Sequence, residues 1–455
     1  MKPFSLTRVL GVLTVSLLVG LALLMGLSGC GKKKPPADLI ILSPNNEKIR
    51  VEFKQAFEEW YQQKYGKHVE VEWRDVGATT VCTTYLINQF KNADTAGIDL
   101  YFGGGGPDYT RLADLGVLQP VELPKETMAQ LPTNLGGIRE YDEKGRWYGT
   151  VVSAFGIIYN SKLLKEQNLP LPKAWDDLAA PGMFGWLELA DAQNSGSARA
   201  AYEMIVQSDP TWPGGWSKLL RIFANCKKIV SSASEIPRQV SDGDVLAGTA
   251  IDFYAYDQMS RNKDVGFVLV EGMTAFTPDP IAMLKGAPHP ELAKQFIEFV
   301  MSEKGQALWC LPVGAPDGPK HDALFRQPLR RDVYEKYAGK MLPELVNPYK
   351  YAGSFKLDIE AYELRSSKLM GPLMQAAVLD SSSQIKQAWK AIIASGTKPE
   401  LVAEFVALPD DLQDRDACLA TAKKITKPED ESALRAAWQR FFRDKYEDII
   451  KKASK

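Results

Sequence analysis

The first third of the chain alternates between two hydrophobic periods. Residues 39–42 form a short apolar run, whereas residues 69–73 alternate apolar with acidic side chains, as in a half-exposed strand. Apolar residues between these segments recur at helical spacing, and a second helical segment over 80–90 precedes a third strand over 98–102. This succession of strands and helices predicts a parallel sheet with helices packed on it, and hence an α/β fold.

Polar loops follow the carboxyl ends of these three strands, at 43–46, 77–80 and 103–106. The carboxyl ends of parallel strands share one edge of a sheet, and ligands of open α/β sheets bind in crevices at that edge. Small and hydroxylated residues there let a ligand approach backbone N–H groups closely. The candidate ligand-binding residues in these loops are Ser43, Asn45, Thr79, Thr80, Gly104 and Gly105.

A second α/β unit is predicted to begin near Phe155. Its expected strands lie at 156–159, 186–190, 228–230, 245–251 and 265–270. A strand at 281–284 and a strongly amphipathic helix follow. We interpret 151–155 and 275–280 as two crossings between the units. Two lobes joined twice form a hinge, so we expect a two-lobed protein.

The expected organisation has five parts. Beyond residue 326 the pattern is largely helical, with many prolines and no chemical motif. The predicted boundaries are a signal peptide at 1–29, a tether at 30–37, a first lobe at 38–154 plus 276–325, a second lobe at 155–275, and a helical C-terminal extension at 326–455.

The amino terminus has the pattern of a bacterial lipoprotein signal. Lys2 and Arg8 are basic, residues 9–24 are apolar, and the tetrapeptide Leu27-Ser28-Gly29-Cys30 resembles a lipobox. That resemblance implies that Cys30 receives lipid and anchors the exported protein on the outer side of a bacterial membrane. The alternative is an ordinary transmembrane helix, but the apolar run barely approaches the ~20 residues that a span needs.

Composition excludes some partners and leaves the cysteines open. Hydrophobic residues make up 45% of the chain, charged residues 24%, and the net charge of −1 offers no basic field for nucleic acid. We expect a monomer without a cofactor. Pairing into disulfides and burial as isolated thiols are both open for the four remaining cysteines. They are Cys82, Cys226, Cys310 and Cys418.

Ser195, Gly196 and Ser197 open a predicted helix and form the best candidate for an anion-binding site. Free N–H groups and the helix dipole favour phosphate, phosphonate or carboxylate there, although an ordinary N-cap explains the same residues. Further candidate ligand-binding residues are Asp252, Tyr254, which follows the end of a strand, and Asp279. Asp279 either places a carboxylate at the hinge or forms part of a structural turn. The chain lacks the Gly-x-Ser-x-Gly and His-Glu-x-x-His motifs of familiar enzymes, so we do not expect an enzyme.

Several segments in a characteristic order resemble the extracellular solute-binding proteins of ABC importers, in the branch that includes periplasmic ferric-ion-binding proteins. The resemblance spans 38–325 and rests on 41–46, 156–160, 172–178, 194–197, 285–288, 293–299 and 305–306. It implies a type II periplasmic-binding-protein fold with two hinge crossings, which closes on a ligand and delivers it to a membrane permease. In ferric-binding relatives the segment matching Ser195 to Ser197 binds a companion anion.

Two departures from that branch weaken the case for iron. Asn45 stands where relatives often have histidine, and Tyr254-Ala255-Tyr256 replaces adjacent tyrosines. If iron binds, Asp252, Tyr254 and Tyr256 supply the oxygen ligands that Fe(III) prefers. We therefore expect a lipid-anchored receptor for a small anionic ligand. The alternatives are a ferric receptor, a protein that presents its ligand-bound state to a membrane sensor, and an enzyme of unrecognised class.

Overall fold

The computed structural model describes residues 38–351, 355 and 357–454. The predicted signal peptide, the tether and the lipid attachment at Cys30 lie outside the described residues. Among the described helices, none is both long and apolar enough to cross a bilayer.

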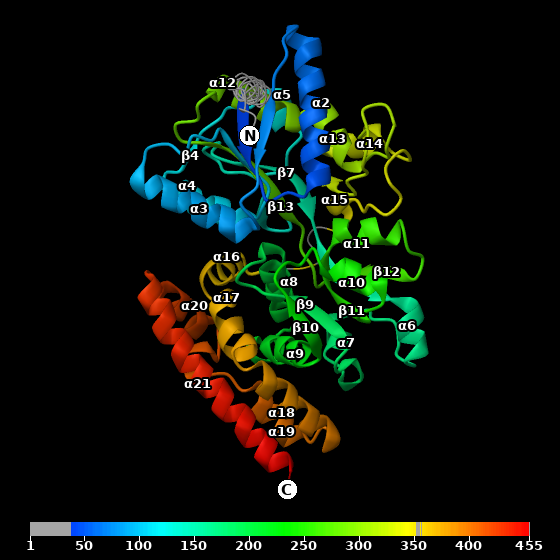
Figure 1. Cartoon of the computed structure of the whole chain (residues 1–455), viewed down its shortest axis with the longest axis vertical. Helices are drawn as coiled ribbons and strands as arrows, with labels where there is room; N and C mark the ends of the chain where they lie inside the picture. The colour runs from blue at the N-terminus through cyan, green and yellow to red at the C-terminus, as the bar shows by residue number, and fades with distance from the viewer. Residues whose placement is uncertain (1–37, 352–354, 356, 455) are drawn as a thin grey trace, which may run out of the picture. The chain divides into compact units, whose positions relative to one another are not determined.

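The first lobe is built on a seven-stranded sheet (Figure 1). β1 pairs in parallel with both β2 and β3, which confirms the predicted parallel arrangement of the first three strands. β13 runs antiparallel to β3, β7 and β4. Across the sheet the strands are β14 (Gln327–Pro328), β7 (Tyr148–Ser153), β13 (Thr277–Leu284), β3 (Leu100–Phe102), β1 (Leu39–Leu42) and β2 (Val71–Arg74), with β4 (Leu118–Gln119) beside β13.

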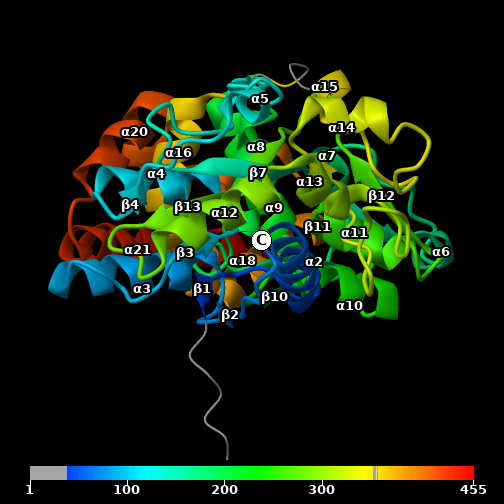
Figure 2. The same ribbon diagram turned by 90° about the horizontal axis from the view of Figure 1, so that it is seen from above.

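Helices cover both faces of this sheet because successive strand residues point to opposite sides. Ile41 of β1 packs with Phe53 of α2, whereas the adjacent Leu42 packs with Cys82 of α3. Figure 2 shows β1 to β3 between α2 and α3. On one face lie α2 (Glu47–Tyr65), α12 (Pro290–Val300) and α13 (Glu303–Cys310), and on the other lie α3 (Thr79–Asn92) and α4 (Gly106–Asp114).

The second lobe contains a five-stranded mixed sheet. β9 is parallel to β10 and β11, whereas β8 is antiparallel to β11 and β12. The strands in order are β10 (Cys226–Val230), β9 (Leu187–Ala190), β11 (Ala247–Ile251), β8 (Phe155–Asn160) and β12 (Val265–Leu269). Its helices are α6 (Ser161–Glu166), α7 (Trp175–Leu178), α8 (Gly196–Gln207), α9 (Trp212–Ala224), α10 (Ile236–Asp242) and α11 (Asp252–Met259).

The chain crosses between the two sheets as predicted. Ala154 separates β7 of the first sheet from β8 of the second, and the chain returns between β12 and β13. The alternative prediction of a turn at Pro278-Asp279-Pro280 is wrong, because these residues belong to β13. The pairing of β13 with β7 shifts register between Asp279 and Pro280, and such an irregularity tolerates prolines that a regular central strand excludes.

The predicted helical C-terminal region is confirmed. From α16 onward it shares a hydrophobic core with the second lobe, whereas α14 packs on α13 of the first lobe. α16 contacts α8, and α18 contacts α9 (Figure 1). The Nε1 of Trp389 in α18 donates to Asn225 Oδ1 at 2.7 Å. The region contains α14 (Arg331–Lys336), α15 (Pro348–Tyr351), α16 (Ile359–Lys368), α17 (Met370–Met374), α18 (Ser382–Ala394), α19 (Pro399–Val406), α20 (Arg415–Lys424) and α21 (Pro428–Ala453).

The structure also decides between the two alternatives for the cysteines. Cys82, Cys226, Cys310 and Cys418 are buried and free rather than paired in disulfides. Burial raises the pKa of the Cys82 and Cys310 thiols to about 12, so both are protonated at neutral pH. They pack as small apolar side chains.

Candidate functional site

A small cavity of about 90 Å³ lies between the two lobes. The first lobe contributes the loop after β1, the start of α3, the loop after β3 and part of β13. The second lobe contributes the starts of β8, α8 and α11. The lining residues are Pro44, Asn45, Asn46, Thr79, Gly104, Gly105, Phe155, Gly196, Ser197, Ala200, Ile251, Phe253, Tyr254, Thr277, Asp279 and Tyr362.

Hydrogen bonds and glycines hold the first-lobe wall in shape. The buried Ser43 hydroxyl donates to Phe102 O at 2.7 Å and accepts from Asn45 N at 3.1 Å. The positive φ of Gly104, 104°, favours glycine, and a Cβ there would lie 2.9 Å from Thr79 Cγ2. The loop after β3 therefore approaches the start of α3 more closely than any residue with a side chain allows.

The second-lobe wall is the amino terminus of α8, a helix of 12 residues. The Ser195 side chain caps it by accepting from Ala198 N at 3.3 Å, whereas Gly196 and Ser197 line the cavity. The two interpretations of this segment are thus compatible, since one residue caps the helix and the next two face the cavity. The first N–H groups of a helix have no intrahelical partner and carry the positive end of its dipole, so this wall favours an anion.

The lobes meet across the cleft at several points. A Cβ on Gly196 would lie 3.6 Å from Thr79 Cβ, which is ordinary contact distance between the lobes. Lys48 of α2 forms an ion pair with Asp257 of α11 at 2.9 Å. These contacts place the first-lobe loops directly opposite the start of α8, as in a closed binding protein.

Asp279 lines the cavity but its charge is already paired. Its carboxylate accepts a hydrogen bond from Arg326, which also donates to Ser153 Oγ at 2.7 Å. The Arg326 guanidinium lies 4.2 Å from the centre of the Phe253 ring. Burial raises the pKa of Asp279, and the neighbouring Arg326 opposes that rise. The pair ties the crossing strands together and presents little free negative charge to the cleft.

Asp252 lies behind the cavity and connects both lobes. Its carboxylate accepts from Ala154 N at 2.7 Å, from Phe253 N at 2.7 Å and from Gln327 Nε2 at 3.0 Å. Complete burial raises the pKa of Asp252 from 3.8 to about 7, although these hydrogen bonds and Arg326 oppose the rise. This carboxyl joins the crossing residue Ala154 to β14 and is expected to titrate near neutral pH.

We expect Asp252→Asn to change how stability depends on pH. A folded pKa above the unfolded value means that the contribution of Asp252 is fully present below about pH 3.8 and is lost as pH rises to about 7. The wild type should therefore lose stability between about pH 5 and pH 8 relative to the variant. Denaturant unfolding at both values measures this. Asp94→Asn, at a carboxylate whose side chain is 97% exposed, is the control and should follow the wild type.

Eight of the twelve predicted ligand-binding residues line the cavity, and four do not. Ser43 shapes the loop after β1, Ser195 caps α8 and Asp252 joins the crossing strands. The hydroxyl of Thr80 is buried, with no hydrogen-bond partner among the described residues. The eight that line the cavity are Asn45, Thr79, Gly104, Gly105, Gly196, Ser197, Tyr254 and Asp279.

The three candidate iron ligands do not surround one space. Tyr254 lines the cavity, but the ring of Tyr256 packs at 5.5 Å on Phe267 and Asp252 is engaged with backbone N–H groups. Within the described part of the chain, no three His, Cys, Asp or Glu residues form a cluster suited to a metal ion.

Sequence reasoning missed residues on which the walls of the site depend. Arg199 and Asp108 lie beside the cavity, and Tyr362 reaches it from the C-terminal region. Arg199 follows Ser197 by two residues and lies in the first turn of α8. Its closeness in sequence to the predicted anion-binding segment could therefore have identified it. Tyr362 has no such signal, because only the packing of α16 against α8 and α4 brings it there.

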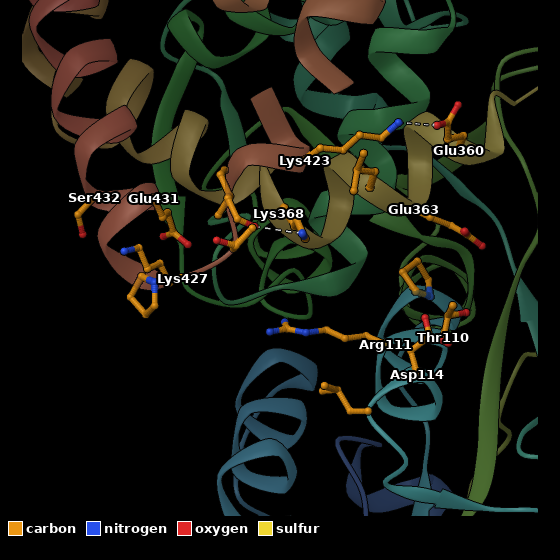
Figure 3. Close-up of a pocket in the computed structure, with 16 residues that line it drawn as sticks. Thr110, Arg111, Asp114, Glu360, Glu363, Lys368, Lys423, Lys427, Glu431 and Ser432 are labelled. Carbon is orange, nitrogen blue, oxygen red and sulfur yellow. Dashed lines mark hydrogen bonds and ion pairs between the residues drawn. The ribbon is translucent and has the colours of Figure 1, made fainter. Parts of the chain in front are cut away.

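A larger cavity of about 750 Å³ separates α4 from the C-terminal helices (Figure 3). Its charges are mixed and partly paired. Lys423 forms an ion pair with Glu360 at 3.1 Å, and Lys368 donates to Ile425 O at 3.1 Å. The Lys423 and Glu360 side chains are more than half exposed, so this groove lacks the single sign of charge and the desolvation that strengthen recognition of an ion. The smaller cleft is therefore the better candidate site.

Residues 54–316 match the sequence profile of a family described as bacterial extracellular solute-binding protein. The chain is also similar to the phosphoglycerate transport regulatory protein PgtC of Salmonella typhimurium, with 25% identity over 276 residues. That match covers 57% of this chain and 62% of PgtC, so the chain spans less than two thirds of this relative. A putative 2-aminoethylphosphonate-binding periplasmic protein of Salmonella paratyphi A is 23% identical over 281 residues, covering 54% of this chain and 82% of that protein.

Solved structures of periplasmic binding proteins share the fold. AfuA from Actinobacillus pleuropneumoniae, with exogenous fructose-6-phosphate bound, aligns with a TM-score of 0.59 at 18% identity, over 77% of this chain and 97% of AfuA. Iron-bound HitA from Pseudomonas aeruginosa aligns with a TM-score of 0.51 at 18% identity, over 72% of this chain and 98% of HitA. At these identities the similarity shows the two-lobed fold alone.

Proposed function

The chain belongs to the bacterial extracellular solute-binding proteins, and on that premise we propose that it captures a small anionic ligand between its lobes for an ABC import permease. One observation carries the proposal: the amino terminus of α8 faces Thr79, Gly104 and Gly105 of the other lobe across a small cavity. A ligand in that position contacts both lobes, so it stabilises the closed form through contacts that the open form lacks. The family and its structural neighbours are binding proteins rather than enzymes.

Phosphate esters and phosphonates are the proposed ligand class. The α8 amino terminus supplies N–H donors and positive potential, and Asn45, Thr79 and Ser197 add neutral polar groups. The names of two relatives, which refer to phosphoglycerate and to 2-aminoethylphosphonate, support the same class. A cavity of about 90 Å³ suits a small group of this kind.

Anchoring would give the receptor its place near the permease. Membership of an extracellular family places the protein outside the cytoplasm. Lipid on Cys30 would then hold the receptor at the membrane surface and raise its effective concentration near a permease. We expect metabolic labelling with a palmitate analogue to mark the wild type and to be lost in Cys30→Ala.

Thermal shift of the soluble chain that begins after Cys30 tests the ligand class. We expect stabilisation by one or more of phosphoglycerate, 2-aminoethylphosphonate and fructose-6-phosphate, and little by Fe(III). A ligand at 100-fold excess over its dissociation constant adds about 2.7 kcal/mol to the free energy of unfolding. Ser197→Trp fills the cavity and should abolish the shift, whereas Ser234→Trp, at an exposed position of the same lobe, should retain it. An unchanged shift in Ser197→Trp would place the ligand elsewhere.

A sensing role is the second candidate. The name of the phosphoglycerate relative describes a transport regulatory protein. In this role the C-terminal helices would be the contact surface for a membrane sensor. Binding to the cleft is common to both roles. A permease that co-purifies with the anchored protein favours transport, whereas a co-purifying membrane kinase favours sensing.

A further inference from the structure

A narrow compartment adjoins the ligand cavity between α4, α8 and α16. It has a volume of about 30 Å³ and shares Gly105, Gly196, Ala200 and Tyr362 with the cavity. Its charged residues are Asp108 from the first lobe and Arg199 from the second. A group bound at the start of α8 is therefore within the immediate surroundings of the Arg199 side chain.

Arg199 is buried without a full set of partners. The residue is only 9% exposed, and its Nη2 lies 3.5 Å from Asp108 Oδ2, which is a long ion pair. Its Nε has no hydrogen-bond partner among the described residues. A guanidinium carries five N–H donors in a rigid fork, and leaving buried donors unsatisfied is unfavourable. The arrangement points to an additional acceptor that completes the site.

We propose that Arg199 is the specificity-determining residue that recognises the phosphoryl or phosphonyl group of the ligand. This assignment rests on the proposed function and specifies its ligand class. The α8 amino terminus and the guanidinium beside it both supply N–H donors, which together suit the three terminal oxygens of a tetrahedral group better than the two oxygens of a carboxylate. Asp108 orients the guanidinium across the cleft, so the same contact links recognition to closure of the lobes.

Tyr362 makes the C-terminal region part of this compartment. The residue is 5% exposed and lines both the cavity and the compartment. Three residues later in α16, Arg365 forms a buried ion pair with Glu203 of α8, which fixes the helix against the second lobe. Tyr362 therefore moves with the second lobe and limits the size of the group that sits beside Arg199.

Calorimetric titration of the soluble chain with inorganic phosphate and 2-aminoethylphosphonate tests the assignment, with malonate as the carboxylate comparison. We expect Arg199→Gln to weaken binding of the phosphorus anions at least about 30-fold, because a buried charged partner is lost. Arg199→Lys should bind these anions more tightly than Arg199→Gln and more weakly than the wild type. Lysine keeps the positive charge but lacks the planar set of donors of a guanidinium. Arg238→Gln, at an exposed arginine of α10, is the matched control and should bind as the wild type does.

The outcomes separate this inference from the proposed function. If none of the three anions binds the wild type, and the thermal-shift panel is also negative, the anion receptor itself is wrong. If phosphate or phosphonate binds Arg199→Gln as tightly as the wild type, the receptor stands and the role of Arg199 is overturned. Should Arg199→Gln melt early without ligand, the double variant Asp108→Asn/Arg199→Gln removes the unpaired carboxylate. We expect this double variant to melt as the wild type does and to bind phosphate or phosphonate at least about 30-fold more weakly than the wild type. Failure of either expectation overturns the role of Arg199.

Discussion

Replacing Arg365 with methionine is expected to lower the free energy of unfolding by about 3–5 kcal/mol. Arg365 is fully buried, and its Nε lies 3.0 and 3.1 Å from the two carboxylate oxygens of the equally buried Glu203. Its guanidinium also lies 3.9 Å from the centre of the Trp212 ring. Methionine fills much of the volume but leaves the Glu203 carboxylate in the core without a counter-ion. Urea unfolding followed by far-UV circular dichroism measures the loss.

Two controls separate the unpaired charge from the loss of packing. Glu203→Leu/Arg365→Met leaves no buried charge, so it should recover most of the lost stability. Arg415→Met, at an arginine whose side chain is 41% exposed and which pairs with Asp358 and Glu360, should cost at most about 1 kcal/mol. A deficit of the double variant equal to that of Arg365→Met would mean that packing, and not the ion pair, fixes α16 to α8.

Much of the fold was predictable because the elements that form the two sheets have strong local patterns. The run at Leu39–Leu42 is buried on both faces, as its uninterrupted apolar character indicates. By contrast, β14 consists only of Gln327 and Pro328, and it is a strand because β7 lies beside it. The segment Pro278-Asp279-Pro280 reads locally as a turn, and only the register shift against β7 allows it in the sheet. Pairing over long sequence separations determines both cases.

The candidate site was predictable where it follows a rule of topology. Loops after parallel strands must meet at one edge, so Asn45, Thr79, Gly104 and Gly105 could be placed together in advance. Tyr362 could not, because its position depends on the packing of a C-terminal helix on a distant lobe. The pairing of Asp279 with Arg326 is equally invisible in the sequence, although it decides how much charge Asp279 presents to the ligand.

The C-terminal region changes how a closing motion must be described. β14 extends the first sheet, whereas α16 and α18 pack on helices of the second lobe. The chain therefore passes between the lobes a third time, after the two crossings beside β7 and β13. A third connection restricts the relative motion of two bodies more than a pair of adjacent strands does. Groups that join these connections therefore affect both stability and closure.

Arg326 is the principal side chain at these connections, and Arg326→Met should also lower the free energy of unfolding by about 3–5 kcal/mol at neutral pH. The arginine is fully buried and contacts Asp279 of β13, Ser153 of β7 and the ring of Phe253 in α11. Its removal leaves Asp279, whose side chain is 16% exposed, without a counter-ion at the back of the cleft. Unfolding of the soluble chain in guanidinium chloride, followed by tryptophan fluorescence, measures this loss of stability.

The pH dependence of this loss identifies its cause. Burial already raises the pKa of Asp279, and removing Arg326 removes the charge that opposes the rise. With a folded pKa above the unfolded one, stability from this group is present at low pH and declines as pH rises through the folded pKa. We therefore expect the deficit of Arg326→Met to be smaller at an acidic pH than at neutral pH, because protonation of Asp279 removes the unpaired charge. Arg326→Met/Asp279→Asn has no such carboxylate, so its smaller deficit should stay constant between these two pH values. Equal deficits of the single and double variants at both pH values would show that the packing of Arg326 on Phe253, and not its charge, stabilises the connections between the lobes.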